Sequence, residues 1–531
     1  MVGGVCPSGL TACGSSVLAA IGERTLSVKS QAKRQRRARR TSKADRFGQA
    51  PRVEIVADDP SLTPFGGSAV VGELVRRLEL IPALDRAIET APKVGGLRPV
   101  KQRARGCSPW QLLVAVAESQ LCGGDSMLDL ERLRADQAGA ELRAVAEMPA
   151  ASTACQLARR YRRSHLRAAE AAFARCANSM DAQLGRTPEG EVTLDFDSTG
   201  VEVFGRNKPG AGVNYQGQLA YQPLVCSWAE RGRLLGSELL AGNDSTRGEE
   251  PRRLLRRVLG CLPDGHGPVR ARFDSGFYRT DLLADCRARG VRFSISVPRS
   301  SAMWSALERI DDDAWQPADA LEDAEVAETT YAPSGWSHEP LRLIVRRVAH
   351  QADALSDDPR ARRKRTIARE QLDLGLAGEA DVVYGYSFIL TDLPGDAATV
   401  EHHHRDRAQI EERIKDAKLG VSLRRLPLSD LDANRVWLHC STLALNLLAL
   451  LNDLMFGIDP PGHLPRRRQA KFVRRMLLCV PARVIHHARR IILRLPAGLR
   501  SAPAFQAAYA AARGLAHRHS PDGPCTRSLT H

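Results

Sequence analysis

Two segments that alternate like β-strands end in aspartates, and this feature constrains the fold more than any other. In residues 191–197 the apolar side chains point to one side of the predicted strand, while Asp195 and Asp197 point to the other. Residues 269–274 alternate in the same way and end at Asp274, directly before a Ser-Gly pair. Carboxylates at the C-terminal ends of strands open onto the crevice where open α/β sheets bind ligands. The pattern therefore predicts an α/β fold with acidic groups at one edge of a sheet.

A third acidic residue lies in a segment whose charges have helical spacing. His404, Arg407, Glu411 and Lys418 are three, four and seven residues apart, so they are predicted to fall on one face of a helix. Acidic groups on three separate elements can hold two divalent metal ions, and two metals can drive in-line chemistry at a phosphodiester. The cations of this stripe would hold phosphate oxygens. The prediction is an enzyme that cuts and joins DNA.

These blocks resemble the DDE transposases of bacterial insertion sequences, in the branch with a Tyr-x2-Arg-x3-Glu-x6-Lys signature. The motifs Asp-x-Asp-Ser-Thr, Asp-Ser-Gly-Phe-Tyr and Glu-x-x-Ile-Lys-Asp-x-Lys are most similar to the group named after insertion sequence 1380. The resemblance covers roughly residues 60 to 500. It implies an RNase H-like catalytic core, two Mg²⁺ ions, and Asp197, Asp274 and Glu411 as catalytic metal ligands.

The chain departs from the family signature at one position, where the tyrosine is replaced by His404. Histidine can still donate a hydrogen bond to phosphate, so His404, Arg407, Lys415 and Lys418 are the predicted DNA contacts. Asp195 stays an alternative first metal ligand. Asp197 is preferred because the aspartate of the family directly precedes small hydroxyl residues.

The predicted reaction is DNA transposition. The protein would bind the terminal inverted repeats of its element, hydrolyse the strands at the element ends and join the 3′-hydroxyl ends to target DNA. One metal would activate water and later the freed 3′-hydroxyl, and the other would stabilise the leaving oxygen. Carboxylates suit Mg²⁺, for which Mn²⁺ should substitute. Two alternatives are a metal-dependent nuclease of the same fold and a catalytically inactive DNA-binding repressor derived from a transposase.

Composition agrees with a polyanionic partner, since the 531 residues carry a net charge of +16 with a pI of about 9.6. Double-stranded DNA is the predicted partner, and a homodimer is expected because two element ends must be brought together. The twelve cysteines lack zinc-site spacing and suit a reduced cytoplasmic, nucleoid-associated protein. No membrane span is predicted, because residues 436–451 read as a buried helix.

The chain is predicted to divide into six regions. The connection from Asp274 to Glu411 spans 411 − 274 = 137 positions, too long for a bare loop. It is therefore expected to contain an inserted β-rich subdomain. The regions are a disordered basic arm (1–55), a helical DNA-binding region (56–185), the first part of an RNase H-like core (186–300), the insertion (301–398), the second part of the core (399–456), and a basic helical region with a tail (457–531).

Further DNA contacts are predicted outside the acidic blocks. Residues 152–163 resemble a recognition helix bearing Arg159, Arg160 and Arg163, with a solvated basic face as the alternative. The basic run 361–365 is a second candidate. In related transposases a tryptophan of the insertion stacks on a flipped base. Three tryptophans are candidates for this role, each with core packing as the alternative: Trp304, Trp315 and Trp336.

Overall fold

The computed structural model describes residues 53–91, 99–101, 103, 105–205, 208–214, 217–242, 246, 248–355, 364–457 and 467–516. Residues Pro60–His531 form one compact unit, distinct from Met1–Asp59. Most of the predicted basic arm, residues 361–363 of the basic run and the end of the predicted tail lie outside the described residues.

The N-terminal part of the unit is helical, as predicted. Helical spacing in the sequence predicts helices over residues 70–84, 109–121 and 153–180. Helix α4 (Pro109–Leu121) has the predicted bounds, because Ser108 caps it and Pro109 begins it. Residues 70–84 instead belong to two helices, α2 (Ser68–Arg77) and α3 (Leu80–Glu89), separated at Glu79 with φ 49°. The helix predicted over 153–180 is likewise divided. The other helices of this part are α5 (Leu130–Ala135), α6 (Ala151–Ala158) and α7 (Arg163–Gln183).

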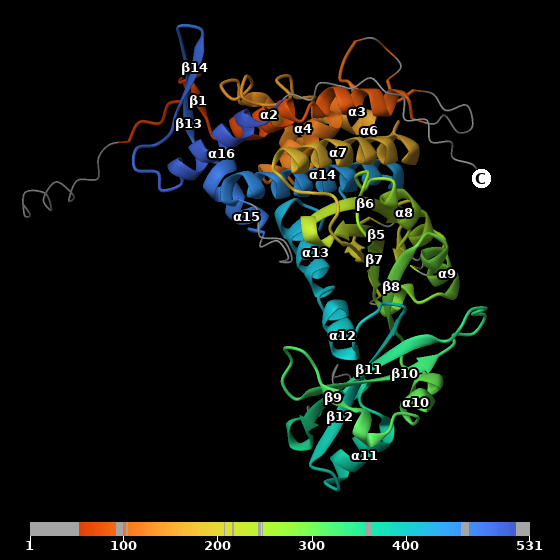
Figure 1. Ribbon diagram of the computed structural model, residues 1–531. Helices are drawn as coiled ribbons and strands as arrows, with labels where there is room; N and C mark the ends of the chain where they lie inside the picture. Colours follow the sequence, from red (N-terminus) through yellow and green to blue (C-terminus); the bar gives the residue numbers. More distant parts are fainter. Residues whose placement is uncertain are drawn as a thin grey trace, which may run out of the picture. The chain divides into compact units, whose positions relative to one another are not determined.

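The strands of the first part of the predicted core form one sheet in the order β6-β5-β2-β7-β8. Figure 1 labels β5, β6, β7 and β8 of this sheet. The first three strands make an antiparallel meander, and β7 and β8 run parallel to β2. Helix α9 (Thr280–Ala288) connects the two parallel strands. The alternating segments of this part of the sequence predict a meander followed by a β-α-β unit, and the sheet has this arrangement. The elements are β2 (Val192–Ser198), β5 (Leu219–Trp228), β6 (Arg233–Leu240), α8 (Glu250–Leu259), β7 (Val269–Phe273) and β8 (Val291–Val297), with short β3 (Val201–Glu202) and β4 (Gly212–Val213) pairing with β5.

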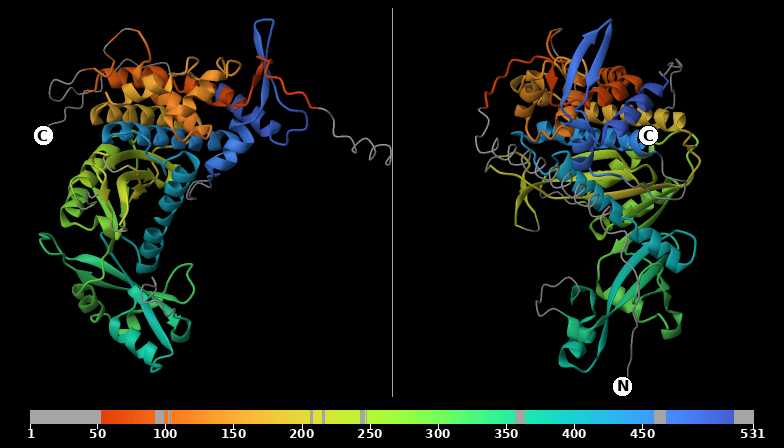
Figure 2. Two further views of the ribbon diagram at one scale, coloured as in Figure 1. Left: turned by 180° about the vertical axis from the view of Figure 1, so that it is seen from behind. Right: turned by 90° about the vertical axis from the view of Figure 1, so that its left-hand side faces the viewer.

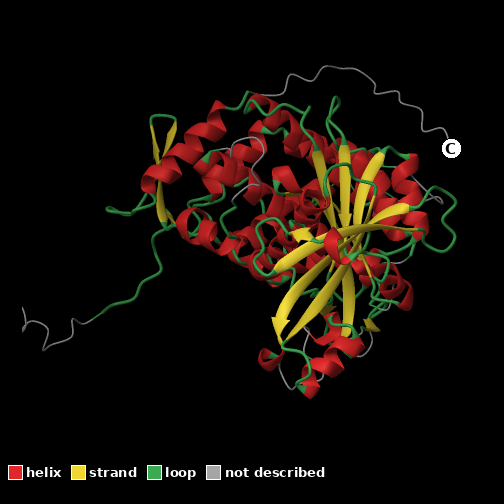
Figure 3. Cartoon of the chain, turned by 60° about the horizontal axis from the view of Figure 1, so that its bottom comes forward, coloured by secondary structure: helices red, strands yellow, loops and turns green. Residues whose placement is uncertain are grey.

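The inserted segment is rich in strands, but it does not form a sheet of its own. Strand β12 (Val382–Thr391) pairs antiparallel with β8, so β12, β11, β10 and β9 extend the same eleven-stranded sheet (Figure 3). The edge residues of β8 thus have backbone partners that a free sheet edge would lack. The other elements here are α10 (Ser301–Leu307), β9 (Gln316–Pro317), β10 (Ala324–Tyr331), β11 (Leu341–Gln351) and α11 (Arg369–Ala377).

The three tryptophans of the insertion pack against other side chains. Trp304 meets the rings of Tyr386 and Phe388 edge-on, and the guanidinium of Arg347 lies 4.1 Å above the ring of Trp315. The guanidinium of Arg287 lies 5.7 Å from the centre of the Trp336 ring, and the His338 ring meets that ring edge-on. These contacts agree with the alternative of core packing.

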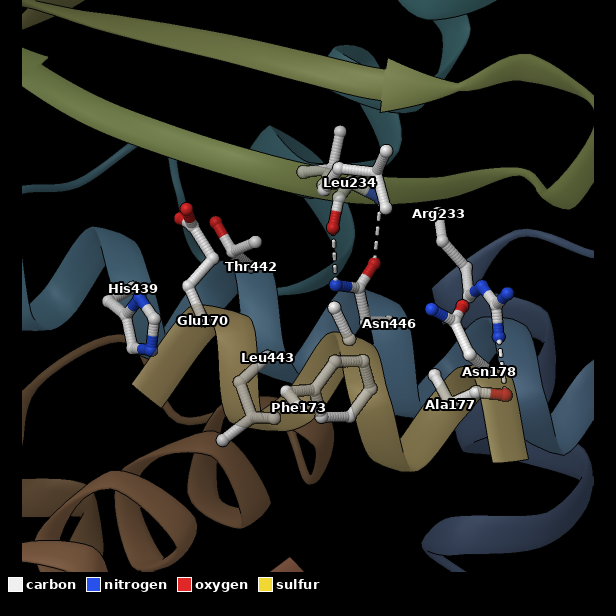
Figure 4. Close-up of a pocket in the computed structure, with 12 residues that line it drawn as sticks. Glu170, Phe173, Ala177, Asn178, Arg233, Leu234, His439, Thr442, Leu443 and Asn446 are labelled. Atoms are coloured by element: carbon white, nitrogen blue, oxygen red, sulfur yellow. Dashed lines mark hydrogen bonds between the residues drawn. The ribbon is translucent and has the colours of Figure 1, made fainter. Parts of the chain in front are cut away.

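Helix α14 (Leu431–Phe456) joins the helices to the sheet. Figure 4 shows its Asn446 side chain holding the backbone of Leu234 in β6, with the Leu234 N–H donating at 2.8 Å and its carbonyl accepting at 2.7 Å. The small cavity beside this contact measures about 20 Å³ and is lined by α7, β6 and α14. Of the described helices, α14 is long and apolar enough to cross a membrane, but 94% of its apolar window is buried within the protein. The predicted buried helix is confirmed.

The C-terminal region contains more structure than predicted. Helix α16 (Ala502–Gly514) lies where an unstructured tail was expected, and it buries Phe505, Ala508 and Ala512 in the core shared with α2 and α14. The tail prediction is wrong here because the alanine-rich composition hides an apolar helix face. Before α16 come α15 (Ala470–Val473) and a hairpin of β13 (Ala482–His487) and β14 (Arg490–Arg494), which pairs with β1 (Leu62–Thr63) (Figure 2).

Candidate active site

The two strand-end aspartates lie at the same height on neighbouring parallel strands. Strands β2 and β7 pair with Asp195 opposite Arg272, so two residues further on Asp197 comes opposite Asp274. Neighbouring strands are about 4.8 Å apart, and residues two apart share a face. The two carboxylates therefore meet at the C-terminal edge of the sheet. There the Asp274 carboxylate accepts a hydrogen bond from the Gly276 N–H at 2.8 Å, which caps the following turn.

The third carboxylate comes from helix α13 (Ala408–Gly420), which packs beside β2. Glu411 lies in its first turn with 62% of its side chain exposed. Arg407 stands between two of the acids: its Nη1 is 3.7 Å from Asp197 Oδ2 and its Nη2 is 3.3 Å from Glu411 Oε1. Asp197 thus has Asp274 on the neighbouring strand and Glu411 on the far side of Arg407.

The predicted continuous charged helix is corrected by the structure. Helix α12 (Ala397–Arg405) ends before Asp406, and α13 begins after Arg407, so His404 does not share a helix with Glu411 and Lys418. Lys418 remains near the site, and its Nζ donates to the carbonyl of Gly200 at 3.2 Å. Burial lowers the pKa of Lys418, while nearby Asp197 opposes that shift.

The predicted DNA contact at His404 does not match its placement. The ring is buried, and each ring nitrogen lies within 2.9 Å of a serine hydroxyl, Ser294 at Nδ1 and Ser296 at Nε2. Burial lowers the pKa of His404 well below its usual value, so the ring is neutral. His404 therefore fastens α12 to β8 and has no nitrogen available for a phosphate.

Both carboxylate oxygens of Asp195, the alternative metal ligand, accept hydrogen bonds from an arginine. Its two oxygens accept from Arg272 Nε at 2.6 Å and Nη2 at 2.9 Å, and both side chains are almost fully buried. Arg272 also donates to the carbonyl of His403 at the end of α12. Asp195 is thus the partner of an arginine, which leaves Asp197 as the first candidate ligand. Strand alternation indicates that Arg272 shares a face with Asp274, but it does not show that Arg272 pairs with Asp195.

The predicted recognition helix is also corrected. Helix α6 ends at Ala158, so Arg159 and Arg160 lie in the turn before α7 rather than along a helix. The Nε of Arg159 lies 3.4 Å from Oδ2 of Asp430. Arg163 is paired with Glu238 at 3.3 Å and Glu250 at 2.8 Å. Acidic partners within the fold thus engage two of the three arginines, while Lys415 is exposed on α13 beside Glu412.

The donor chemistry of the site fits a hard divalent cation, which prefers carboxylate oxygens. Burial raises the pKa of Asp197 to about 6; Arg407 opposes the shift, and the carboxylates of Asp274 and Glu411 add to it. Bound cations would relieve this mutual repulsion. Among the described residues, no three His, Cys, Asp or Glu side chains are close enough to form a ready-made metal group. Asp197, Asp274 and Glu411 are the residues that would hold a metal here.

The raised pKa of Asp197 predicts a pH dependence of stability. Because the folded protein binds this proton more tightly than the unfolded chain, the metal-free free energy of unfolding should fall as pH rises from about 4 to about 6. The fall is on the order of 3 kcal/mol, at about 1.4 kcal/mol per tenfold change in proton affinity. Urea unfolding in EDTA of wild type and Asp197→Asn measures it. The stability difference between them should widen with pH over this range, and a constant difference would contradict the prediction.

A family model described as "Transposase DDE domain group 1" matches residues 45–357 and 361–517. The chain belongs to this transposase family. The match spans β2, β7 and α13, the three elements that bring the acidic residues together. No curated protein matches the chain. A solved structure, "Cryo-EM structure of piggyBac transposase synaptic complex with hairpin DNA (SNHP)", is similar at 10% identity and a TM-score of 0.34, covering 77% of this chain and 78% of that one.

Proposed function

We propose that this member of the transposase family cuts both ends of an insertion sequence and joins the 3′-hydroxyl ends to target DNA. The observation that carries the proposal is the placement of Asp197 and Asp274 at neighbouring strand ends, with Arg407 linking Asp197 to Glu411. The charges of Asp274 and Glu411 both raise the pKa of Asp197. The three carboxylates repel one another unless a cation or a substrate is bound there.

The catalytic unit is proposed to be an RNase H-like core. Three antiparallel strands followed by two parallel ones, in the order β6-β5-β2-β7-β8, support this assignment. The first acid lies on the central strand β2 and the second directly after β7. The third follows on α13, after strands that extend the same sheet.

The metal proposed for this site is Mg²⁺, as two ions, with Mn²⁺ as a substitute. When bound between the carboxylates, the ions would supply the activation of water and the stabilisation of the leaving oxygen. The side chains around them have their own tasks. Arg407, whose guanidinium lies 3.7 Å from Asp197 and 3.3 Å from Glu411, would donate to a phosphate oxygen bound beside these acids. Lys418, whose pKa is raised by the charge of Asp197 against the larger effect of burial, would hold a neighbouring phosphate.

The proposed partner of the protein is double-stranded DNA. The protein would act on double-stranded DNA, at the inverted repeats of its element and at the target, as a homodimer in the DNA complex. The resemblance to the group named after insertion sequence 1380 supports a bacterial element and a cytoplasmic, nucleoid-associated enzyme. Lys415, exposed on α13, is a proposed DNA contact.

A strand-transfer assay tests the proposed function against a nuclease that only cuts. The substrate is a duplex that ends in the pre-cut 3′-hydroxyl of the element, offered with a supercoiled plasmid and Mg²⁺. We expect covalent joining of that end to the plasmid. A matched duplex with a 3′-dideoxy end should give no joined product. Cleavage of the uncut element end without any joining of the pre-cut end would favour the nuclease.

A further inference from the structure

The hairpin of β13 and β14 has two faces of different character. On its inner face, Val484 and Leu493 pack with Ala69 and Leu142 against the helices. On its outer face, Arg483, His487, Arg490, Ile492 and Arg494 are exposed and Ile485 is half-buried. The inner face is also exposed near the tip, where Ile491 is 45% exposed. Three cross-strand pairs make up the outer face: Arg483 opposite Arg494, Ile485 opposite Ile492, and His487 opposite Arg490.

Three exposed arginines of this hairpin have no acidic partner in the described part of the fold: Arg489, Arg490 and Arg494. An acidic contact of the hairpin is at His486, whose Nε2 lies 3.8 Å from Glu141 Oε1. Residues 460–521 contain thirteen Lys and Arg and no Asp or Glu. An external polyanion would supply the counter-charge that these three arginine side chains lack.

The turn of the hairpin holds an arginine in a strained backbone. Its two central residues, Ala488 and Arg489, have φ of 47° and 62°. Two-residue hairpin turns with both φ positive strongly favour Asn-Gly or Gly-Gly, because other residues are strained there. Strain of this kind is common at functional sites. Arg489 thus places a guanidinium at the tip of the hairpin, at a position whose positive φ favours glycine.

We propose that the outer face of this hairpin binds the major groove of double-stranded DNA. A two-stranded β-ribbon fits that groove. The arginines would contact phosphates or guanine edges, and the Ile485–Ile492 pair would contact thymine methyl groups. The hairpin extends from the helices on the side away from the sheet that bears the acidic site (Figures 1 and 2). It would therefore hold DNA at a distance from the cleaved bond. The inference rests on the proposed function, since that function requires DNA.

Fluorescence anisotropy of the full chain with a labelled duplex of the element end, in EDTA over a range of salt, tests the inference. Arg490→Gln with Arg494→Gln should weaken binding at least tenfold at low salt. It should also make the plot of log affinity against log salt less steep by about 1.8, because each phosphate contact contributes about 0.9. The control removes two charges from other elements, as Arg289→Gln with Arg309→Gln. An equal loss in the control would overturn the inference.

A second pair of variants separates charge from folding of the turn. Ala488→Gly and Arg489→Gly both give the turn the glycine that its backbone favours, but only Arg489→Gly removes a charge. We expect Ala488→Gly to bind DNA as wild type does and Arg489→Gly to bind more weakly, with a smaller salt slope. Equal binding and equal slopes for both would overturn the inference. If wild type itself binds no duplex, the proposed function fails as well; intact binding by every hairpin variant defeats the hairpin alone.

Discussion

Replacing Glu411 by glutamine should reduce strand cleavage by at least about a thousandfold. The change removes a negative charge from the acidic site while keeping the shape of the side chain. Several kcal/mol of transition-state stabilisation depend on the metals that this charge would help to hold, and each 1.4 kcal/mol is about tenfold in rate. Because Glu411 is 62% exposed, the variant should fold normally. The measurement is the single-turnover rate of nicking at the element end.

The same helix offers a matched control. Glu412 is the next residue, is 67% exposed and pairs only weakly with Lys415 at 3.5 Å. Glu412→Gln removes an equal charge from α13 without touching the acidic site, so its cleavage rate should stay within about twofold of wild type, as surface ion pairs contribute little. Both variants should keep their affinity for the element end. Undiminished cleavage by Glu411→Gln would remove Glu411 from the site.

Breaking the buried pair of Asp195 and Arg272 should cost about 3–5 kcal/mol of stability. Each side chain is at most 2% exposed, so removing one partner leaves a charge in the core. Arg272→Met and Asp195→Leu should each lower the free energy of unfolding by about that amount. Urea unfolding of the single variants measures the loss.

The double variant separates two accounts of this pair. If each side chain serves only to neutralise the charge of the other, the double variant Arg272→Met with Asp195→Leu should regain most of the lost free energy of unfolding. Replacement of a buried ion pair by apolar residues is often neutral for stability. Arg272 also holds the His403 carbonyl at the end of α12, before the break that leads to Glu411. We therefore expect the stable double variant to cleave DNA more slowly than wild type. Full activity would show that Arg272 has no positioning role.

Much of the core and of the acidic site could be predicted from local patterns. The alternation around Asp197 and Asp274 placed both on strand ends, and the register of β2 and β7 brings them together. The bounds of α4 followed from a cap and a proline, which act within a few residues. Strand alternation and helix capping involve residues close together in the chain, so a short stretch of sequence is enough to predict them.

Other features depended on contacts between distant segments. The break between α12 and α13 is accompanied by the burial of His404 between two serines of β8, more than a hundred residues earlier. Helical spacing alone could not show this, since a charged stripe is compatible with one helix or two. The pairing of β12 with β8 is a contact between strands about 90 residues apart. Similarly, the sequence predicts a basic helix face at Arg159 and Arg163, because their acidic partners Asp430 and Glu238 lie far away in the chain.

The central claim is metal-dependent cleavage at the sheet edge formed by Asp197 and Asp274. Its most direct test incubates the purified protein with a labelled duplex that spans one end of the flanking element. Mg²⁺, EDTA and an Asp274→Ala variant are compared. We predict nicking at the element boundary with Mg²⁺ and wild type, and none with EDTA or Asp274→Ala. Tight binding of the duplex by wild type without any cleavage would contradict the account and favour a DNA-binding repressor.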